Sequence, residues 1–262
     1  MEDKLVGPSM NENRRTIQSV ENAREIMAVL EERGGASVAE VTEQVELTRG
    51  TVHTYLVTLN EEGFIRKSSD GEYDLNLKIL DLASSIRERQ PIYRHGRNEA
   101  NELAIATGDV THLAVESDGV VYMLYSSRGS LKQETPSNGR LPMHASATGK
   151  ALLAKMSDDR VEEIIDQHGL ESLTTHTITD REQLYEELET VRERGYANNY
   201  QEQTVGAQTY ATDVQLPDGS LAGSIGISGT IGRFETKDTD ELVQTMIEAA
   251  NQIEINIQRA RS

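Results

Sequence analysis

One segment, residues 19–73, constrains the fold more than any other, because it places three helices and a hairpin in a fixed order. Ser19 is positioned to cap the first helix, and Gly34 with Gly35 to end it. The apolar residues of this helix recur at helical spacing, namely Val20, Ala23, Ile26, Met27 and Leu30. This periodicity predicts a helix that buries one face.

Two shorter helices follow. Ser37 and Glu40 have the spacing of a capping box, in which the hydroxyl and the carboxylate satisfy opposite backbone donors. After a tight turn, Thr48 is a cap for the third helix, which Gly63 would end. The apolar positions of these two helices are Val41, Val45, Val52, Tyr55, Leu56 and Leu59. Two short helices joined by a tight turn are typical of a helix-turn-helix.

The other sides of the third helix carry small, hydroxylated or basic residues, which let a helix approach the major groove closely. The candidate base-reading residues are Thr48, Arg49, Gly50, Thr51, His53 and Thr54. The guanidinium of Arg49 is able to bond a guanine edge or a phosphate. We therefore interpret this surface as the part that reads a base sequence.

A hairpin follows the third helix. Its polar turn covers residues 68–71, and its first strand ends in Arg66 and Lys67, which would lie along the phosphate backbone. Three helices and such a wing predict a winged helix-turn-helix that binds double-stranded DNA. A winged helix retained for contacts with proteins is the alternative interpretation.

At 262 residues the chain suits two domains. We expect a flexible tail over residues 1–12, the DNA-binding domain over 13–75, a linker helix over 76–90 and a second domain over 91–262. No apolar run approaches ~20 residues, and residues 1–4 do not begin a basic segment followed by an apolar one. We therefore expect neither a membrane span nor a secretory signal. The absence of cysteine agrees with a reducing, cytoplasmic location.

The net charge of -18, from 44 acidic and 26 basic residues, has the wrong sign for a protein that meets a polyanion. Acidic residues thin out between Leu47 and Ser69, where DNA would lie. The acidic excess resembles that of proteins from salt-accumulating cytoplasm. At molar salt the Debye length is ~3 Å, so a remote acidic domain hardly repels DNA. A regulator that has lost specific DNA binding is the competing explanation.

The linker region carries a narrow apolar stripe, formed by Ile79, Leu82, Ala83 and Ile86. The polar residues 87–90 and Pro91 end it. This stripe either packs on its own domain or pairs with a copy of itself, and pairing would give a dimer with two DNA-binding heads.

The second half alternates helical and strand patterns. Strands are predicted at 110–116, 120–126, 207–216 and 221–228, joined in pairs by turns that contain Gly119 and Gly219. Helices are predicted at 93–106, 146–155 and 158–167. Two more are predicted, one that begins at a capping box of Thr179 and Glu182 and one near the end of the chain. These elements predict an α+β domain with an antiparallel sheet flanked by helices.

Small residues near 147 suggest a ligand site in this domain. They leave backbone amides open at a helix N-terminus, where Ser146 and Thr148 add hydroxyl donors and the helix dipole favours an anion such as a carboxylate. Gly226 and Gly229 remove side chains from a strand where another group comes close, which a ligand or tight packing explains equally well.

The N-terminal layout, the linker helix and two later segments resemble the IclR family of transcriptional regulators. The segments are 141–154, with the sequence LPMHASATGKALLA, and 219–229, with GSLAGSIGISG. The resemblance covers nearly the whole chain. It implies a DNA-binding homodimer, often assembled to a homotetramer, that acts as a repressor or an activator through a GAF-like or profilin-like effector domain.

The resemblance also implies a pocket for a small metabolite, an organic acid or a sugar-derived compound, with no cofactor. The residues that match this pocket are His144, Ser146, Ala147, Thr148, Asn199, Ala207, Gly226 and Ser228. Family members commonly carry arginine at the positions of Thr54 and Gln208, so the operator sequence and the effector chemistry do not transfer in detail.

Other classes of function have less support. His144 and Ser146 suggest a hydrolase pair, but the chain has no Gly-x-Ser-x-Gly elbow and no acid at a fixed spacing to orient the histidine. The candidate metal ligands His112, His144, His168 and His176 show no i, i+4 pairing. With two phenylalanines and no tryptophan, the chain lacks the stacking residues of a single-strand reader.

Overall fold

The computed structural model describes residues 16–129 and 139–261, so the predicted tail over 1–12 lies outside the described residues. The chain divides into two compact units, one that ends at Ile86 and one that continues from Arg87 to the C-terminus. Each unit has its own hydrophobic core, as expected for two domains.

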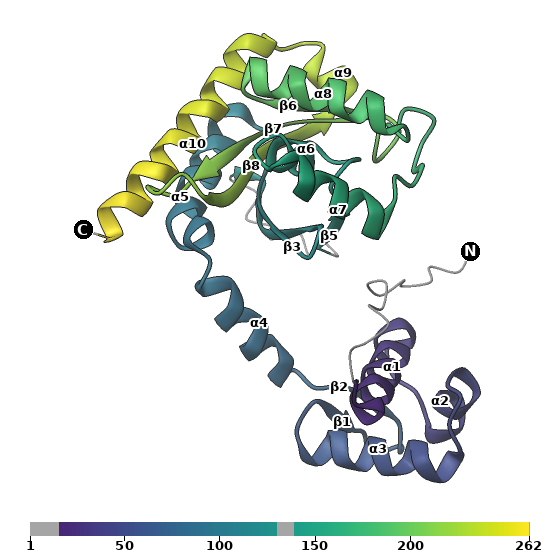
Figure 1. Cartoon of the computed structure of the whole chain (residues 1–262). Helices are drawn as coiled ribbons and strands as arrows, with labels where there is room; N and C mark the ends of the chain where they lie inside the picture. The colour runs from purple at the N-terminus through teal and green to yellow at the C-terminus, as the bar shows by residue number, and fades with distance from the viewer. Residues whose placement is uncertain (1–15, 130–138, 262) are drawn as a thin grey trace. The chain divides into compact units, whose positions relative to one another are not determined.

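The N-terminal unit contains three helices and a two-stranded antiparallel wing (Figure 1). Its elements are α1 Gln18–Arg33, α2 Val38–Gln44, α3 Arg49–Glu61, β1 Ile65–Lys67 and β2 Tyr73–Leu75. The core is built from the predicted apolar positions, with Ile26, Leu30, Val41, Val52 and Leu56 fully buried. The winged helix-turn-helix order is confirmed.

Local caps fix two of these helices. Ser37 and Glu40 form the predicted capping box of α2, and the Thr48 hydroxyl accepts the Thr51 amide of α3 at 3.3 Å. The predicted cap of α1 is wrong. That helix begins at Gln18 after Ile17, with no side-chain cap, so Ser19 already lies inside the first turn.

Helix α4, Lys78–Glu88, lies at the boundary between the two units. None of its residues is buried, and Leu80, Leu82 and Ile86 are more than half exposed. Of the predicted stripe residues, Leu82, Ala83 and Ile86 are exposed and Ile79 is half-buried, so the stripe is not packed into the core of either unit.

The C-terminal unit is built on one six-stranded antiparallel sheet with the order β5-β4-β3-β8-β7-β6. The strands are β3 Val110–Ser117, β4 Val120–Ser127, β5 Arg140–Pro142, β6 Ala197–Tyr200, β7 Ala207–Gln215 and β8 Leu221–Thr230. Asp118 and Gly119 both have positive φ, which gives the tight β3–β4 hairpin the twist of its strands.

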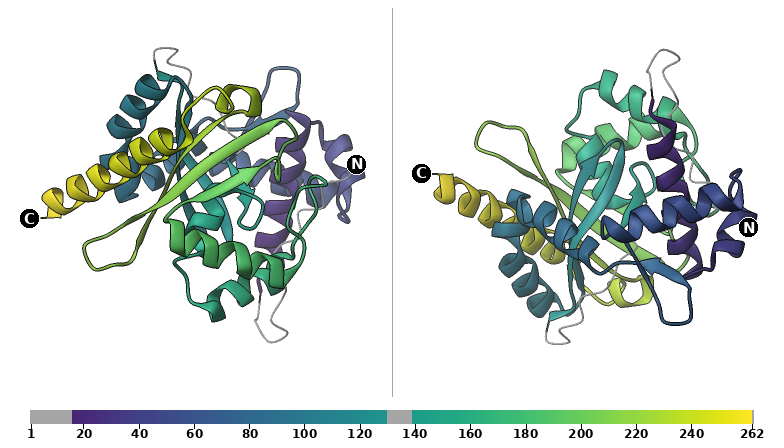
Figure 2. Two further views of the ribbon diagram at one scale, coloured as in Figure 1. Left: turned by 90° about the horizontal axis from the view of Figure 1, so that it is seen from above. Right: turned by 90° about the horizontal axis from the view of Figure 1, so that it is seen from below.

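Helices cover both faces of this sheet (Figure 2). On one face α5 Pro91–Thr107 and α10 Thr239–Arg261 enclose a core around Leu113, Ile225 and Ile253. On the other face lie α6 Ala147–Leu153, α7 Asp158–His168 and α8 Arg181–Arg194, with Leu152, Leu184 and Leu188 at the centre of a second core. The short helix α9, Ile231–Phe234, follows β8.

The α+β fold with its antiparallel sheet is confirmed, with two differences in detail. The short strands β5 and β6 were not predicted, because neither has enough residues to show an alternating pattern. The capping box at Thr179 and Glu182 is wrong. Asp180 caps α8 instead, and its carboxylate accepts the Gln183 amide at 3.0 Å.

Candidate nucleic-acid interface and ligand site

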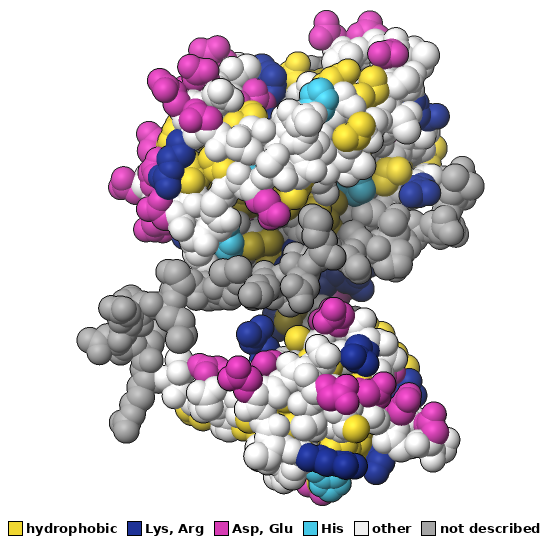
Figure 3. Space-filling view, turned by 90° about the vertical axis from the view of Figure 1, so that its right-hand side faces the viewer, with side chains coloured by type: hydrophobic (Ala, Val, Ile, Leu, Met, Phe, Trp, Pro, Cys, Tyr) yellow, Lys and Arg dark blue, Asp and Glu magenta, His cyan; other side chains and the backbone are white. Residues whose placement is uncertain are grey.

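The first turns of α3 present the predicted base-reading residues to solvent. Thr48, Arg49, Gly50, Thr51, His53 and Thr54 are all exposed. The opposite side of the helix is anchored by Val52, Leu56 and Leu59 in the core. A polar face held on a rigid, capped helix is the geometry that a recognition helix requires. Figure 3 shows Lys or Arg side chains beside a histidine on this unit.

Two hydroxyls of α3 are already hydrogen-bonded within the helix. Thr54 Oγ1 donates to the Gly50 carbonyl at 3.0 Å, and Thr51 Oγ1 lies 2.8 Å from Thr48 Oγ1. The proton of Thr54 is thus used inside the protein, so this side chain offers a methyl group and oxygen lone pairs to a ligand. A thymine methyl or a base amino group suits such a surface.

The wing is tied to the end of α3, because the Lys67 amide donates to Asn60 Oδ1 at 3.1 Å. Arg66 is bonded to Asp74 on the partner strand, with 2.8 Å between Nη2 and Oδ2. Lys67 Nζ lies over the Tyr73 ring, 5.3 Å from its centroid. The two predicted phosphate-contacting residues are consecutive in β1 and have different partners, and the charge of Arg66 is partly offset by Asp74.

Four of the predicted ligand residues, Ser146, Ala147, Thr148 and Gly226, lie where α6 approaches β8. Ala147 and Thr148 begin α6 and are buried, and Ser146 caps the helix by accepting the Gly149 amide at 3.2 Å. A Cβ on Gly226 would lie 3.3 Å from Thr148 Cγ2. The missing side chain at Gly226 therefore lets the strand and the helix approach closely.

Three more predicted residues lie on the neighbouring strands. Asn199 on β6 donates to the Ala145 carbonyl and accepts the Glu202 amide. Ser228 on β8 pairs across the sheet with Thr209, with 2.8 Å between the two hydroxyl oxygens. Ala207 is the first residue of β7 and is half-buried. Gln208, at a position where family members often have arginine, donates instead to the Tyr210 hydroxyl.

Sequence reasoning missed a polar pair on the central strands. His112 on β3 is the cross-strand partner of both Gly226 and Ser126, and its Nδ1 lies 2.8 Å from Ser126 Oγ. The sequence alone marks His112 only as a candidate metal ligand. Its place beside Gly226 depends on the pairing of β3 with β8, which no local pattern reveals.

His112 should make folding stability depend on pH. Burial, aided by the positive charge of Arg128, lowers the pKa of His112 from 6.5 to about 4. Between these values the unfolded chain binds a proton that the folded protein does not, so stability falls as the pH falls. The wild-type protein should lose about 3 kcal/mol of its free energy of unfolding between about pH 7 and pH 4, and His112→Gln should not show this loss.

Urea unfolding at constant salt measures this difference. His176 is exposed, so His176→Gln is the matched control and should retain the wild-type dependence. An equal loss of stability on acidification in the wild type and in His112→Gln would contradict the assignment.

His144 and Ser146 are not paired with each other. His144 Nε2 lies 3.0 Å from the Glu171 carbonyl oxygen, whereas the Ser146 hydroxyl donates to the Pro142 carbonyl at 2.8 Å. The His144 ring lines a cavity that none of the other seven predicted ligand residues touches. This arrangement gives no support to a base and nucleophile.

No group of three acidic, histidine or cysteine side chains in residues 16–129 and 139–261 could hold a metal ion. No helix in the same ranges is long and apolar enough to cross a membrane.

A winged helix that exposes one polar face of α3, followed by a separate α+β domain, is an architecture found among transcriptional regulators. Residues 19–69 match the IclR helix-turn-helix domain, and residues 85–255 match the C-terminal domain of bacterial IclR transcriptional regulators. The chain belongs to the IclR family. Its relatives are transcriptional regulators, and it is a regulator and not an enzyme.

One relative is the probable HTH-type transcriptional regulator ArcR of Halobacterium salinarum, 32% identical over 252 residues that cover 94% of this chain and 96% of that protein. The Thermotoga maritima IclR crystal structure has a TM-score of 0.74 at 23% identity and covers 92% of this chain and 99% of its own. An IclR homologue from Microbacterium hydrocarbonoxydans, complexed with 4-hydroxybenzoate, has a TM-score of 0.78 at 20% identity, with coverages of 92% and 99%.

Proposed function

We propose that this regulator binds operator DNA through α3 and responds to a small, anionic metabolite, and that it controls genes for the use of that metabolite. The observation that carries the proposal is the exposed first turn of α3, which presents Arg49 and hydroxylated residues on a capped helix. The C-terminal unit supports the proposed response to a metabolite, because polar side chains meet there around Gly226.

An anionic effector is favoured by the charge near this site. Arg128 lies close enough to His112 to lower its pKa further, so a positive potential acts on the polar cluster. The Microbacterium homologue binds 4-hydroxybenzoate, which carries a carboxylate. We extend this chemistry to the present chain as an organic acid or a sugar acid.

The working unit is a homodimer or a pair of dimers. The exposed apolar side chains of α4 would be covered by the same helix of a second copy, which supplies the second reading head. Effector binding would then favour one distance between the two DNA-binding domains over another. The affinity for an operator would depend on whether the spacing of its half-sites matches that distance.

Arg49→Ala should weaken operator binding about tenfold or more per reading head, because one good base or phosphate contact carries roughly 1–3 kcal/mol. The measurement is a gel-shift titration in molar salt, with DNA selected by the wild-type protein from a random library. Arg24→Ala changes an exposed arginine of α1 and is the matched control. Unchanged affinity in Arg49→Ala would remove this residue from the interface, and failure to select any sequence would favour a metabolite-binding module that has lost specific DNA binding.

Ser228→Leu should abolish the effector response and leave operator binding intact, since the added bulk would fill the space beside Thr209 and β3. The response is the release or tightening of DNA when small organic acids and sugar acids are added. Ser228→Ala adds no bulk and should weaken the response less. A full response in Ser228→Leu to the same compound would place the effector elsewhere.

A further inference from the structure

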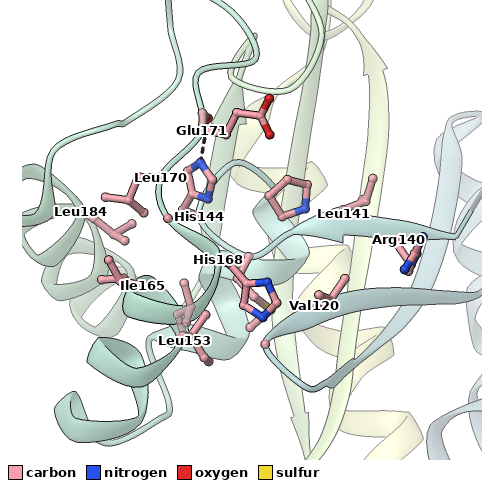
Figure 4. A pocket seen from close by; sticks show the side chains of 15 residues that line it. Val120, Arg140, Leu141, His144, Leu153, Ile165, His168, Leu170, Glu171 and Leu184 are labelled. Atoms are coloured by element: carbon pink, nitrogen blue, oxygen red, sulfur yellow. Dashed lines mark hydrogen bonds between the residues drawn. The ribbon is translucent and has the colours of Figure 1, made fainter. Parts of the chain in front are cut away.

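A cavity of about 260 Å³ lies between the start of β4, strand β5 and helices α7 and α8. Most of its wall residues are apolar, among them Val120, Leu141, Leu153, Ile165 and Leu184. The polar residues of the lining are His144, His168, Arg140 and Glu171, and all but His144 are exposed. Figure 4 shows the rings of His144 and His168 between the leucine and isoleucine side chains of the helices and the strand residues Val120 and Leu141. The cavity is separate from the polar cluster at Gly226 and Ser228, neither of which lines it.

His144 places one hydrogen-bond acceptor at this cavity. Its Nε2 lies 3.0 Å from the Glu171 carbonyl oxygen, and a carbonyl only accepts, so this nitrogen carries the proton. Burial lowers the pKa of His144, which favours the neutral ring. Nδ1 therefore bears a lone pair. None of the described residues donates a hydrogen bond to Nδ1, although His144 is only 5% exposed.

His168 closes the rim of the cavity. Its Nε2 lies 2.7 Å from the Asp118 carbonyl oxygen in the β3–β4 turn. A Cβ on Gly119 would lie only 2.6 Å from that nitrogen, so the glycine permits the contact. The turn and the end of α7 are thus held together over the cavity by one side chain.

Size and chemistry together select the occupant. A cavity of about 150 Å³ lined by apolar side chains binds benzene, so the present one has room for a six-membered ring with small substituents. Arg140, the cation in the lining, is exposed to solvent, so its charge is screened by water. Beside the buried His144, the apolar side chains and the Nδ1 lone pair disfavour a carboxylate and favour a ligand that donates. We propose that this cavity is a second ligand site, for an uncharged monocyclic compound whose hydroxyl donates to His144 Nδ1.

The full-length protein should bind phenol, the probe for this site, in ligand-observed NMR titrations. Anisole has the same ring without a hydroxyl proton, and we expect it to bind about fivefold more weakly. In protein with ¹⁵N-labelled histidine, phenol should shift the Nδ1 resonance of His144 and leave its Nε2 resonance nearly unchanged.

Two variants locate the binding. Leu170→Trp adds bulk at a half-buried position of the cavity wall and should abolish phenol binding, whereas Ser228→Leu at the proposed effector site should retain it. The proposal is overturned if phenol does not bind, if anisole binds equally well, or if Leu170→Trp retains binding that Ser228→Leu loses. The NMR shift needs no variant, so a Leu170→Trp protein that fails to fold leaves the test intact.

Discussion

Replacing Lys150 with methionine is expected to destabilise the protein by about 3–5 kcal/mol, the cost of leaving a buried charge without its partner. Lys150 is 1% exposed, and its three ammonium protons are matched by three acceptors. Nζ lies 2.6 Å from Glu202 Oε1, 2.7 Å from the Asn198 carbonyl and 3.2 Å from Glu187 Oε1. One side chain of α6 therefore joins α8, β6 and the loop after β6.

The loss should depend on pH. Burial already raises the pKa of the Glu202 carboxyl against the opposing effect of Lys150, and Glu202 Oε2 has no hydrogen-bond partner among the described residues. Without Lys150 this pKa would rise further, so the folded variant would take up a proton that the unfolded chain lacks. The variant should thus recover stability as the pH falls toward the ordinary pKa of a glutamate carboxyl.

Denaturant unfolding in constant molar salt measures the effect. Lys155→Met is the matched control, because Lys155 is partly exposed and makes one ion pair of 3.6 Å with Asp213. It should cost less than about 1 kcal/mol. The double variant Lys150→Met with Glu202→Met should recover more than half of the loss, since it removes the isolated charge. A loss no larger than that of Lys155→Met would disprove the role of the buried cluster.

Gly149→Ala should destabilise the protein by about 3 kcal/mol, although alanine normally stabilises a helix by about 1 kcal/mol relative to glycine. A Cβ at this position would lie 2.3 Å from the carbonyl oxygen and 2.6 Å from the Cα of Met143. Both are backbone atoms, so no side chain can move aside to make room. The loop before α6 has to shift as a whole.

Gly232→Ala separates helix propensity from packing. Gly232 lies in α9, and a Cβ there would meet no heavy atom within 4 Å. This control should be neutral or slightly stabilising, by up to about 1 kcal/mol. Equal midpoints for Gly149→Ala and the wild type in thermal unfolding would show that the loop tolerates the methyl group.

The N-terminal unit could be predicted from sequence because its signals are local. The capping box at Ser37, the cap at Thr48 and the apolar spacing of α3 each lie within a few residues of the structure that they specify. The same holds for the β3–β4 hairpin and for β7–β8, whose turns carry positive-φ glycines at Gly119 and Gly219.

The rest depends on contacts between distant segments. The sheet pairs β3 with β8, more than a hundred residues later, and this pairing alone puts His112 beside Gly226. The predicted ligand residues from α6, β6, β7 and β8 remain a proposal for the same reason, since their proximity is tertiary. His144 is two residues from Ser146 in the chain, yet its ring lies in the α7–α8 cavity, because the loop before α6 turns sharply around Gly149.

The pairing of Arg66 with Asp74 in the wing bears on how the regulator searches a chromosome. Affinity for arbitrary DNA comes almost entirely from phosphates neutralised by cations, and each lost contact flattens the salt slope by about one. A wing whose arginine charge is partly offset by Asp74 gains less binding free energy from the phosphates of arbitrary duplex DNA. We therefore expect weaker nonspecific binding, and shorter sliding along DNA, than a wing with an unpaired arginine would give.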